Sequence, residues 1–232
     1  MKVFAAAEAL WREWNARINV ISRKDEDNIY AHHILHSLAI AEYLRRFYPE
    51  DYAWMSAAGC HCATVLDVGT GGGFPGIPLA MTLPAARFTL CDSIGKKVRV
   101  AQAVAEGLGL QNVSCVQSRV EDLPGEWDWV VSRAVTSLEN FYPWVRGKYR
   151  RSILYLKGGD VAAETSALQR RFHIPASKIR IWPIAPWVSG LRIAEASVLP
   201  GLAAADVQPI LTIAPVSLSE YYAEKYVIEI AR

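Results

Sequence analysis

The chain has 232 residues, of which 52% are hydrophobic and 21% are charged. This is the composition of a globular protein, and it excludes disordered, collagen-like and coiled-coil chains. The 25 Lys and Arg residues nearly balance the 23 Asp and Glu residues, with a formal net charge of +2, which excludes a protein that coats nucleic acid through bulk charge. At about 150 residues per domain, we expect one domain with an appendage.

The first twenty residues do not form a secretion signal, because Glu8, Arg12 and Glu13 interrupt their apolar run. The longest uncharged stretch, residues 68–86, is too rich in Gly and Pro to be a membrane span. The four cysteines, at positions 60, 62, 91 and 115, lack disulfide spacing, as is typical of reduced thiols. We therefore expect a cytoplasmic protein with no membrane partner.

Neither Cys60-His61-Cys62 nor the histidines at 32, 33 and 36 complete a ligand set for a metal ion, so we predict no metal.

Two amphipathic segments come first along the chain. Residues 4–21 and 28–48 place apolar side chains at helical spacing, and Pro49 is expected to end the second helix. We interpret residues 1–60 as an N-terminal helical extension of a second region, residues 61–232.

The rhythm then changes to short apolar runs that alternate with helical patterns. Strands are predicted at 64–68, 88–92, 113–117, 127–132 and 151–156, with helices near 77–83, 95–108 and 137–147. Such alternation indicates a parallel sheet built from βαβ units. Residues 179–184 and 226–231 are predicted to add two strands, which makes a mostly parallel sheet of seven. An irregular insertion near 186–222 separates them.

A glycine-rich loop follows the first strand, and two cofactor classes compete for it. Gly71, Gly73 and Gly76 satisfy G-x-G-x-x-G, and Asp92 lies about 20 residues further on. That pattern is typical of a nicotinamide-dinucleotide site. A plain tight turn without a ligand is the third interpretation.

The same loop also fits D-x-G-x-G-x-G, the motif of class I S-adenosylmethionine-dependent methyltransferases. Its positions are Asp67, Gly69, Gly71 and Gly73. We favour this assignment because Pro75 stands where a dinucleotide needs an ordinary first helical turn, and because a helical extension before the first strand is unusual for a dehydrogenase. The predicted fold class is therefore α/β, with the Rossmann-like methyltransferase fold.

The segment after the fourth strand narrows the chemistry. It has the sequence Ser132-Arg133-Ala134-Val135, without the N/D-P-P-Y loop of amino-group methylation. No cysteine follows a proline, as cytosine C5 methylation typically requires. A target with its own lone pair, such as guanine N7, needs neither a nucleophile nor a base, so catalysis is then positioning and electrostatics.

Over residues 11–160 the chain resembles one family, the bacterial 16S rRNA (guanine-N7) methyltransferases, RsmG, also called GidB or glucose-inhibited division protein B. The most specific motif is the extension of the glycine loop, Phe74-Pro75-Gly76-Ile77-Pro78. Further matching motifs are Trp14-Asn15-x-x-Ile18-Asn19, His33-Ile34-Leu35-x-Ser37-Leu38, Asp92-Ser93-x-x-Lys96-Lys97, Arg119-x-Glu121, Ser132-Arg133-Ala134 and Leu156-Lys157-Gly158.

The resemblance implies a monomeric enzyme that uses S-adenosyl-L-methionine and acts on 16S ribosomal RNA or a small-subunit assembly particle. It implies these cofactor-binding residues: Gly69, Thr70, Gly71, Gly73, Phe74, Asp92, Val120, Glu121 and Arg133. Arg133 and Lys157 are expected to position the substrate without any protein nucleophile. The chain departs from the family pattern at His36, where the family usually has Asp.

Two other functions fit the sequence. One is an RNA- or ribosome-binding module that keeps the methyltransferase fold, and the other is methylation of a different RNA, a small molecule or a protein. The charge distribution favours an RNA partner, because residues 140–180 carry 9 Lys and Arg against 2 Asp and Glu. Arg146, Lys148, Arg150 and Arg151 lie there among aromatic residues, a mixture that suits RNA contact near the proposed active edge.

Overall fold

The computed structural model describes residues 3–57, 63–190 and 215–232. Cys60-His61-Cys62 and most of the 186–222 segment lie outside these described residues. No described helix has both the length and the apolar composition needed to cross a membrane.

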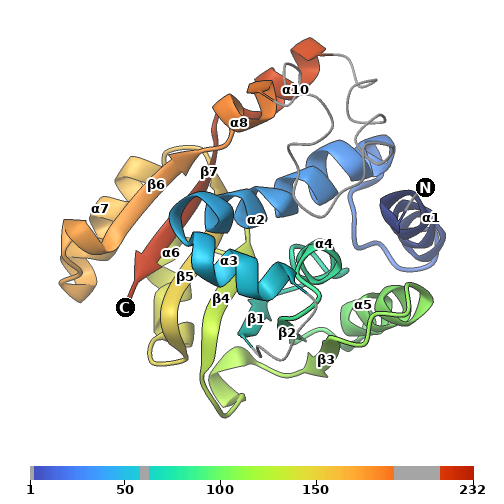
Figure 1. Ribbon diagram of the computed structural model, residues 1–232, viewed down its shortest axis with the longest axis horizontal. Helices are drawn as coiled ribbons and strands as arrows, with labels where there is room; N and C mark the ends of the chain where they lie inside the picture. Colours follow the sequence, from blue (N-terminus) through green and yellow to red (C-terminus); the bar gives the residue numbers. More distant parts are fainter. Residues whose placement is uncertain (1–2, 58–62, 191–214) are drawn as a thin grey trace.

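The centre of the molecule is a seven-stranded sheet in the order β3-β2-β1-β4-β5-β7-β6 (Figure 1). The first five strands are parallel, whereas β7 runs antiparallel to both β5 and β6. All seven predicted strands are present, at Thr64–Val68, Arg87–Asp92, Val113–Gln117, Trp127–Arg133, Tyr149–Gly158, Ile179–Pro183 and Lys225–Ala231. Strand β5 is longer at both ends than predicted, so Lys157 lies within it rather than after it.

Helices connect the parallel strands. The helices α4 (Gly76–Thr82), α5 (Gly95–Gly107) and α6 (Leu138–Val145) match the predicted segments within one or two residues. Helix α7 (Val161–Phe172) was not predicted. Its beginning has a local cause, because the Asp160 side chain accepts a hydrogen bond from the N–H of Ala163.

The N-terminal extension is more segmented than the two predicted helices. It contains α1 (Val3–Asn15), a 3₁₀-helix (Arg23–Asn28), a π-helix (Ile29–Ile34), α2 (Leu35–Phe47) and α3 (Pro49–Ser56). Pro49 marks the end of α2, as predicted, but it also begins a third helix that was not predicted, since proline fits the first turn of a helix.

Helices cover both faces of the sheet (Figure 1), and two apolar clusters fill the space between them and the sheet. Alternate strand residues such as Val65, Leu90 and Trp129 pack with α1–α5, and their neighbours such as Leu66 and Val130 pack with α6 and α7. The extension shares the first cluster with the sheet. The division at residue 60 therefore stays a prediction about sequence, while in space these residues belong to one core.

The described parts of the C-terminal insertion are α8 (Ala185–Gly190) and α10 (Pro215–Tyr222). Trp187 is buried and Trp182 is partly buried against the same core. Helix α10 returns to the N-terminal segment, because the Tyr222 hydroxyl donates to the carbonyl of Ala31.

Candidate functional site

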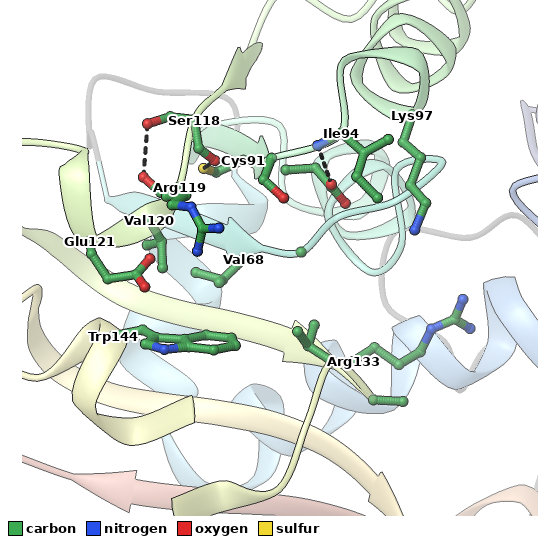
Figure 2. Close-up of a pocket in the computed structure, with 15 residues that line it drawn as sticks. Val68, Cys91, Ile94, Lys97, Ser118, Arg119, Val120, Glu121, Arg133 and Trp144 are labelled. Carbon is green, nitrogen blue, oxygen red and sulfur yellow. Dashed lines mark hydrogen bonds between the residues drawn. The ribbon is translucent and has the colours of Figure 1, made fainter. Parts of the chain in front are cut away.

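A cavity of about 390 Å³ opens at the carboxyl ends of β1, β2 and β4 (Figure 2). Strands β2 and β3 lie on one side of β1, and β4 and β5 on the other, so the cavity lies where the strand order reverses. Open α/β sheets bind ligands at this point. The lining residues are Val68, Gly69, Cys91, Asp92, Ser93, Ile94, Lys97, Ser118, Arg119, Val120, Glu121, Arg133, Ala134, Val135 and Trp144.

The structure gathers part of the predicted cofactor set around this cavity. The predicted residues that line it are Gly69, Asp92, Val120, Glu121 and Arg133. The others belong to the same glycine loop without lining the cavity, namely Thr70, Gly71, Gly73 and Phe74. Thr70 and Phe74 are buried beneath it. The glycine loop thus supplies part of the cavity surface, and its buried residues support that surface from within the protein.

At two positions of this loop, a positive φ and a close contact together require glycine. Gly69 has a φ of +68°, and an added Cβ would lie 2.4 Å from Cγ2 of Val135. Gly73 has a φ of +105°, and its Cβ would lie 2.3 Å from Cδ1 of Ile77. Residues with side chains rarely adopt such angles. The loop is therefore held tightly between the segment after β4 and helix α4.

Asp67, the first residue of the glycine motif, supports the loop from below and does not line the cavity. Its Oδ2 accepts hydrogen bonds from Thr70 Oγ1 at 2.6 Å and from the Gly76 N–H at 2.8 Å. Complete burial raises the pKa of Asp67 to about 7, although these two hydrogen bonds oppose the shift. Asp67 thus ties the end of β1 to the start of α4.

Asp92 ends β2 and does line the cavity. Its Oδ2 accepts the Gly71 N–H at 3.0 Å, and its Oδ1 accepts the Ile94 N–H at 2.9 Å. These bonds join the glycine loop to the start of α5. A carboxylate offers about four acceptor positions, so Asp92 keeps capacity for the hydroxyl groups of a ligand.

The segment after β4 forms the opposite wall. Ala134 has a φ of +50°, an unusual value for a residue with a side chain. The Tyr155 hydroxyl stabilises this turn: it accepts the N–H groups of Val135 and Thr136 and donates to the Thr136 carbonyl. A strained turn is thereby fixed next to the cavity.

Lys157 supports the same turn and does not line the cavity. Its Nζ lies 3.0 Å from the Thr136 carbonyl and 3.0 Å from Glu164 Oε1. Glu164 in turn accepts the N–H of Leu138 at the start of α6. Lys157 is therefore a partly buried link between β5, α7 and the wall of the cavity.

Arg133, at the end of β4, points toward the N-terminal helices (Figure 2). Its Nη2 lies 2.9 Å from His33 Nδ1, and its Nη1 donates to the His32 carbonyl at 3.3 Å. Its guanidinium carbon lies 5.0 Å from the centre of the Phe74 ring, which stacks on Trp11. His33 thus packs against Phe74 and also borders the pocket through its contact with Arg133.

Sequence reasoning missed several lining residues. Trp144 was grouped with a basic segment, but its ring forms a wall of the cavity near Glu121 (Figure 2). Ile94 and Val135 are exposed apolar residues that also line the cavity. An exposed apolar rim at a pocket lined by both acids and cations suits a flat ring with polar edges. No local sequence signal links α6 to this site, since only the sheet brings them together.

The cysteine in the cavity is not a nucleophile. Burial, reinforced by the negative charge of Asp92, raises the pKa of Cys91 to about 11. Burial likewise raises the pKa of Cys115 to about 11. Both thiols are therefore protonated near neutral pH, and the described part of the chain offers no thiolate at the cavity.

The expectation that the basic cluster lies beside the active edge is wrong. Residues 146–151 precede or begin β5, so they lie at the opposite edge of the sheet from the cavity. Arg150 pairs with Glu126 and Asp128, and Arg151 pairs with Asp51 at 2.9 Å. Acids from other segments thus pair with two of the four cations, whereas the Lys148 ammonium donates to the Leu123 carbonyl and Arg146 has no acid within 4.0 Å among the described residues.

Arg119 and Glu121 both line the cavity but do not form an ion pair with each other. In the described residues, the three cations that line the cavity, Lys97, Arg119 and Arg133, have no carboxylate within 4.0 Å. Among the described residues, the cavity is thus lined by three cations and by the two acids Asp92 and Glu121, without a close ion pair between them.

Comparison with known proteins agrees with this geometry. Residues 5–181 match the family described as rRNA small subunit methyltransferase G, GidB. The Ribosomal RNA small subunit methyltransferase G of Flavobacterium psychrophilum is 50% identical over 169 residues, which cover 69% of this chain and 75% of that protein. The protein of the same name from Porphyromonas gingivalis is 44% identical over 78% of each chain.

Solved structures show the same fold at low identity. The plantazolicin methyltransferase BpumL matches with a TM-score of 0.59 and 12% identity over 97% of this chain and 95% of that chain. Magnesium protoporphyrin IX methyltransferase (ChlM) from Synechocystis matches with a TM-score of 0.58 and 12% identity over 97% of each. Together with the sequence matches, they establish that this chain has the Rossmann-like methyltransferase fold and belongs to the rRNA small subunit methyltransferase G family.

Proposed function

We propose that this protein methylates N7 of a guanine in 16S ribosomal RNA with S-adenosyl-L-methionine as the methyl donor. Family membership gives the reaction class and the small-subunit rRNA. The observation that supports the site most directly is Asp92, which borders the cavity while its carboxylate anchors both the glycine loop and the start of α5.

The residues present fit this cofactor. The cavity combines an acid at the end of β2, a glycine whose Cβ would have no room, and an aromatic wall at Trp144. Asp92 would accept the ribose hydroxyls, and Glu121 with the backbone at Val120 would bind the adenine edge. The glycine loop would shape the part of the site that binds the methionine end of the cofactor, in part from beneath the cavity. Its residues there are Gly69, Thr70, Gly71, Gly73 and Phe74. Arg133 would border that end.

The cofactor supplies an electrophilic methyl group, and guanine N7 already carries a lone pair, so the chain needs no nucleophile or base. The protonated thiol of Cys91 is consistent with this requirement. The contribution of the protein is then to orient the guanine and to exclude water. Arg133 would orient the base or a phosphate through its remaining N–H groups. Lys157 would act indirectly, by holding the turn at Thr136.

The RNA would approach the carboxyl edge, where Lys97 and Arg119 lie unpaired among the described residues. We further propose that the protein acts as a monomer in the cytoplasm on 16S rRNA or a small-subunit particle. An RNA partner is consistent with Lys97 and Arg119 at this edge and with the acid-paired Arg150 and Arg151 at the other.

The experiment is in vitro methylation of small-subunit particles from cells that lack this protein, with radiolabelled S-adenosylmethionine. We expect label in 16S rRNA as 7-methylguanine, and we expect adenosylhomocysteine, but not NADH, to raise the melting temperature. Cofactor binding without transfer to any RNA would favour the binding-module alternative. Label in protein or a small molecule instead would assign a different substrate.

A further inference from the structure

A series of polar contacts connects the N-terminal segment to Arg133 at the cavity. Asp25 Oδ2 lies 2.7 Å from His33 Nε2, and His33 Nδ1 lies 2.9 Å from Arg133 Nη2. The three residues come from the 3₁₀-helix, the π-helix and the end of β4. Only the tertiary structure brings them together, because about 100 residues separate the last two.

The contacts determine the tautomer of His33. A guanidinium can only donate hydrogen bonds, so His33 Nδ1 accepts and carries a lone pair. The ring proton is then on Nε2 and is donated to Asp25. Burial, reinforced by the charge of Arg133, lowers the pKa of His33 to about 4, so the ring is neutral near pH 7.

Asp25 is held as a carboxylate. Burial raises its pKa, but the hydrogen bonds from His32 and His33 outweigh this effect and lower the pKa of Asp25 overall. His32 Nδ1 lies 2.6 Å from Asp25 Oδ1, so each oxygen of the carboxylate binds one histidine. An amide in place of the carboxylate would offer only one such oxygen.

Helix α10 and the π-helix hold the histidines in place. The His32 ring stacks on Tyr221 with a centroid distance of 3.6 Å, and the Tyr221 hydroxyl donates to the His32 carbonyl. The Tyr222 hydroxyl donates to the preceding carbonyl of Ala31. π-Helical turns are frequent at functional sites. This turn presents His33 to Arg133 from a well-fixed backbone.

We propose that Asp25 and His33 are positioning residues that fix the guanidinium of Arg133 at the cavity, with Asp25 selecting the His33 tautomer that can accept from it. The inference rests on the proposed function, in which Arg133 contacts cofactor or RNA. His32 and His33 use two of the five N–H groups of Arg133. The histidine ring and the carbonyl are neutral acceptors, so they orient the cation without neutralising it. The charge remains directed to an anionic or electron-rich ligand.

Nuclear magnetic resonance of ¹⁵N-labelled histidines tests the tautomer directly. At pH 7 we expect His33 to be neutral with its proton on Nε2, and we expect Arg133→Ala to shift the Nδ1 resonance alone. Asp25→Asn should raise the population of the other tautomer. Asp27→Asn is the matched control, because Asp27 is in the same segment and is fully exposed. A charged His33, or a proton on Nδ1, would overturn the proposal.

Two substitutions separate positioning from packing. In His33→Asn the amide oxygen can replace Nδ1 and still accept from Arg133, whereas in His33→Gln the amide reaches the place of Nε2 and Asp25 instead. We expect His33→Gln to lower kcat for rRNA methylation by about 100-fold and His33→Asn to remain at least about tenfold more active. A packing role predicts the reverse order, since Gln is closer to His in size. His173→Gln, at an exposed histidine, is the control.

A double-mutant cycle with Arg133→Ala completes the test. If His33 acts through Arg133, the Asn and Gln variants become equal in the Arg133→Ala background, both in kcat and in adenosylhomocysteine affinity. Additive losses would overturn the proposal. If no variant, including the wild type, methylates rRNA, the proposed function fails. The histidine spectra and the cofactor affinities would still decide the role of Asp25 and His33.

Discussion

The two edges of the sheet differ in how their charges are partnered. At the amino edge, Arg150 and Arg151 come from the most basic stretch of the chain, yet Glu126, Asp128 and Asp51 pair with them. At the carboxyl edge, Lys97, Arg119 and Arg133 are far apart in sequence and have no such partner among the described residues. A run of like charges in sequence is therefore a poor guide to the field at the surface, because acids from other segments can neutralise it.

The carboxyl edge also combines unusual backbone with a buried acid of perturbed pKa. Gly69, Gly73 and Ala134 all have positive φ there, and Asp67 is buried beneath the loop. Positive φ also occurs at Gly109, Gly125, Gly147 and His173, in the turns that lead into β3, β4, β5 and β6 at the other edge. The carboxyl edge differs in that its positive-φ residues Gly69 and Ala134 line a cavity above a buried acid, as expected of a binding site. The following predictions test this difference, beginning with the largest effect.

Replacement of Asp92 should have the largest consequence. Hydrogen bonds to a charged group contribute about 1.5–3 kcal/mol each, so loss of two ribose contacts in Asp92→Ala should weaken adenosylhomocysteine binding at least about 100-fold. Isothermal titration calorimetry provides the measurement. Asp122→Ala, which removes an exposed acid nearby, should leave the affinity unchanged. A Kd for Asp92→Ala within about threefold of the wild type would remove Asp92 from the cofactor site.

Substitution of two loop glycines separates steric contact from backbone strain. Gly69→Ala combines a φ of +68° with a Cβ 2.4 Å from Val135, whereas Gly71→Ala has a φ of +58° and no atom within 4 Å of its Cβ. The backbone alone costs about 1–2 kcal/mol, so we expect Gly69→Ala to lower the free energy of unfolding by about 3 kcal/mol and Gly71→Ala by about 1 kcal/mol. Urea unfolding measures both. Val135→Ala should recover part of the Gly69→Ala loss, and equal losses in the two variants would contradict this account.

The buried carboxyl group of Asp67 should make stability depend on pH. Its pKa in the folded protein is about 7, above the ordinary value of 3.8, so between these values the folded state binds more protons than the unfolded state. Stability from this group is therefore present at low pH and lost as the pH rises. Relative to Asp67→Asn, the wild type should lose about 2 kcal/mol between pH 5 and pH 7. A pH-independent difference between the two proteins would show that Asp67 is ionised throughout.

The smallest effect is expected at the amino edge. Arg150→Ala together with Arg151→Ala should change the affinity for small-subunit rRNA less than about twofold, since surface ion pairs already occupy both side chains. Lys97→Ala with Arg119→Ala should weaken it by about tenfold and reduce its salt dependence. Filter binding at several salt concentrations compares the two double variants. Stronger weakening by the Arg150 and Arg151 pair would place the RNA at the amino edge after all.

Much of the fold followed from local patterns in the sequence. The seven strands and the glycine loop were predictable because strand alternation, turn glycines and helix spacing are encoded over a few neighbouring residues. Helix α7 was missed, and the single helix predicted over residues 28–48 contains a π-helical turn. That turn depends on contacts from Tyr221 and Tyr222, nearly 190 residues away.

The site likewise has some features that local sequence patterns predict and others that depend on tertiary contacts. The sequence by itself determined the residues that need special backbone or chemical character, such as Gly69 and Asp92, because motif spacing reports those needs directly. Only the tertiary structure decided that Trp144 lines the cavity, that Lys157 supports a turn instead, and that Asp25 and His33 hold Arg133. The physical reason is that these contacts cross the sheet or join distant segments. Their energy depends on burial and mutual geometry, which no local pattern records.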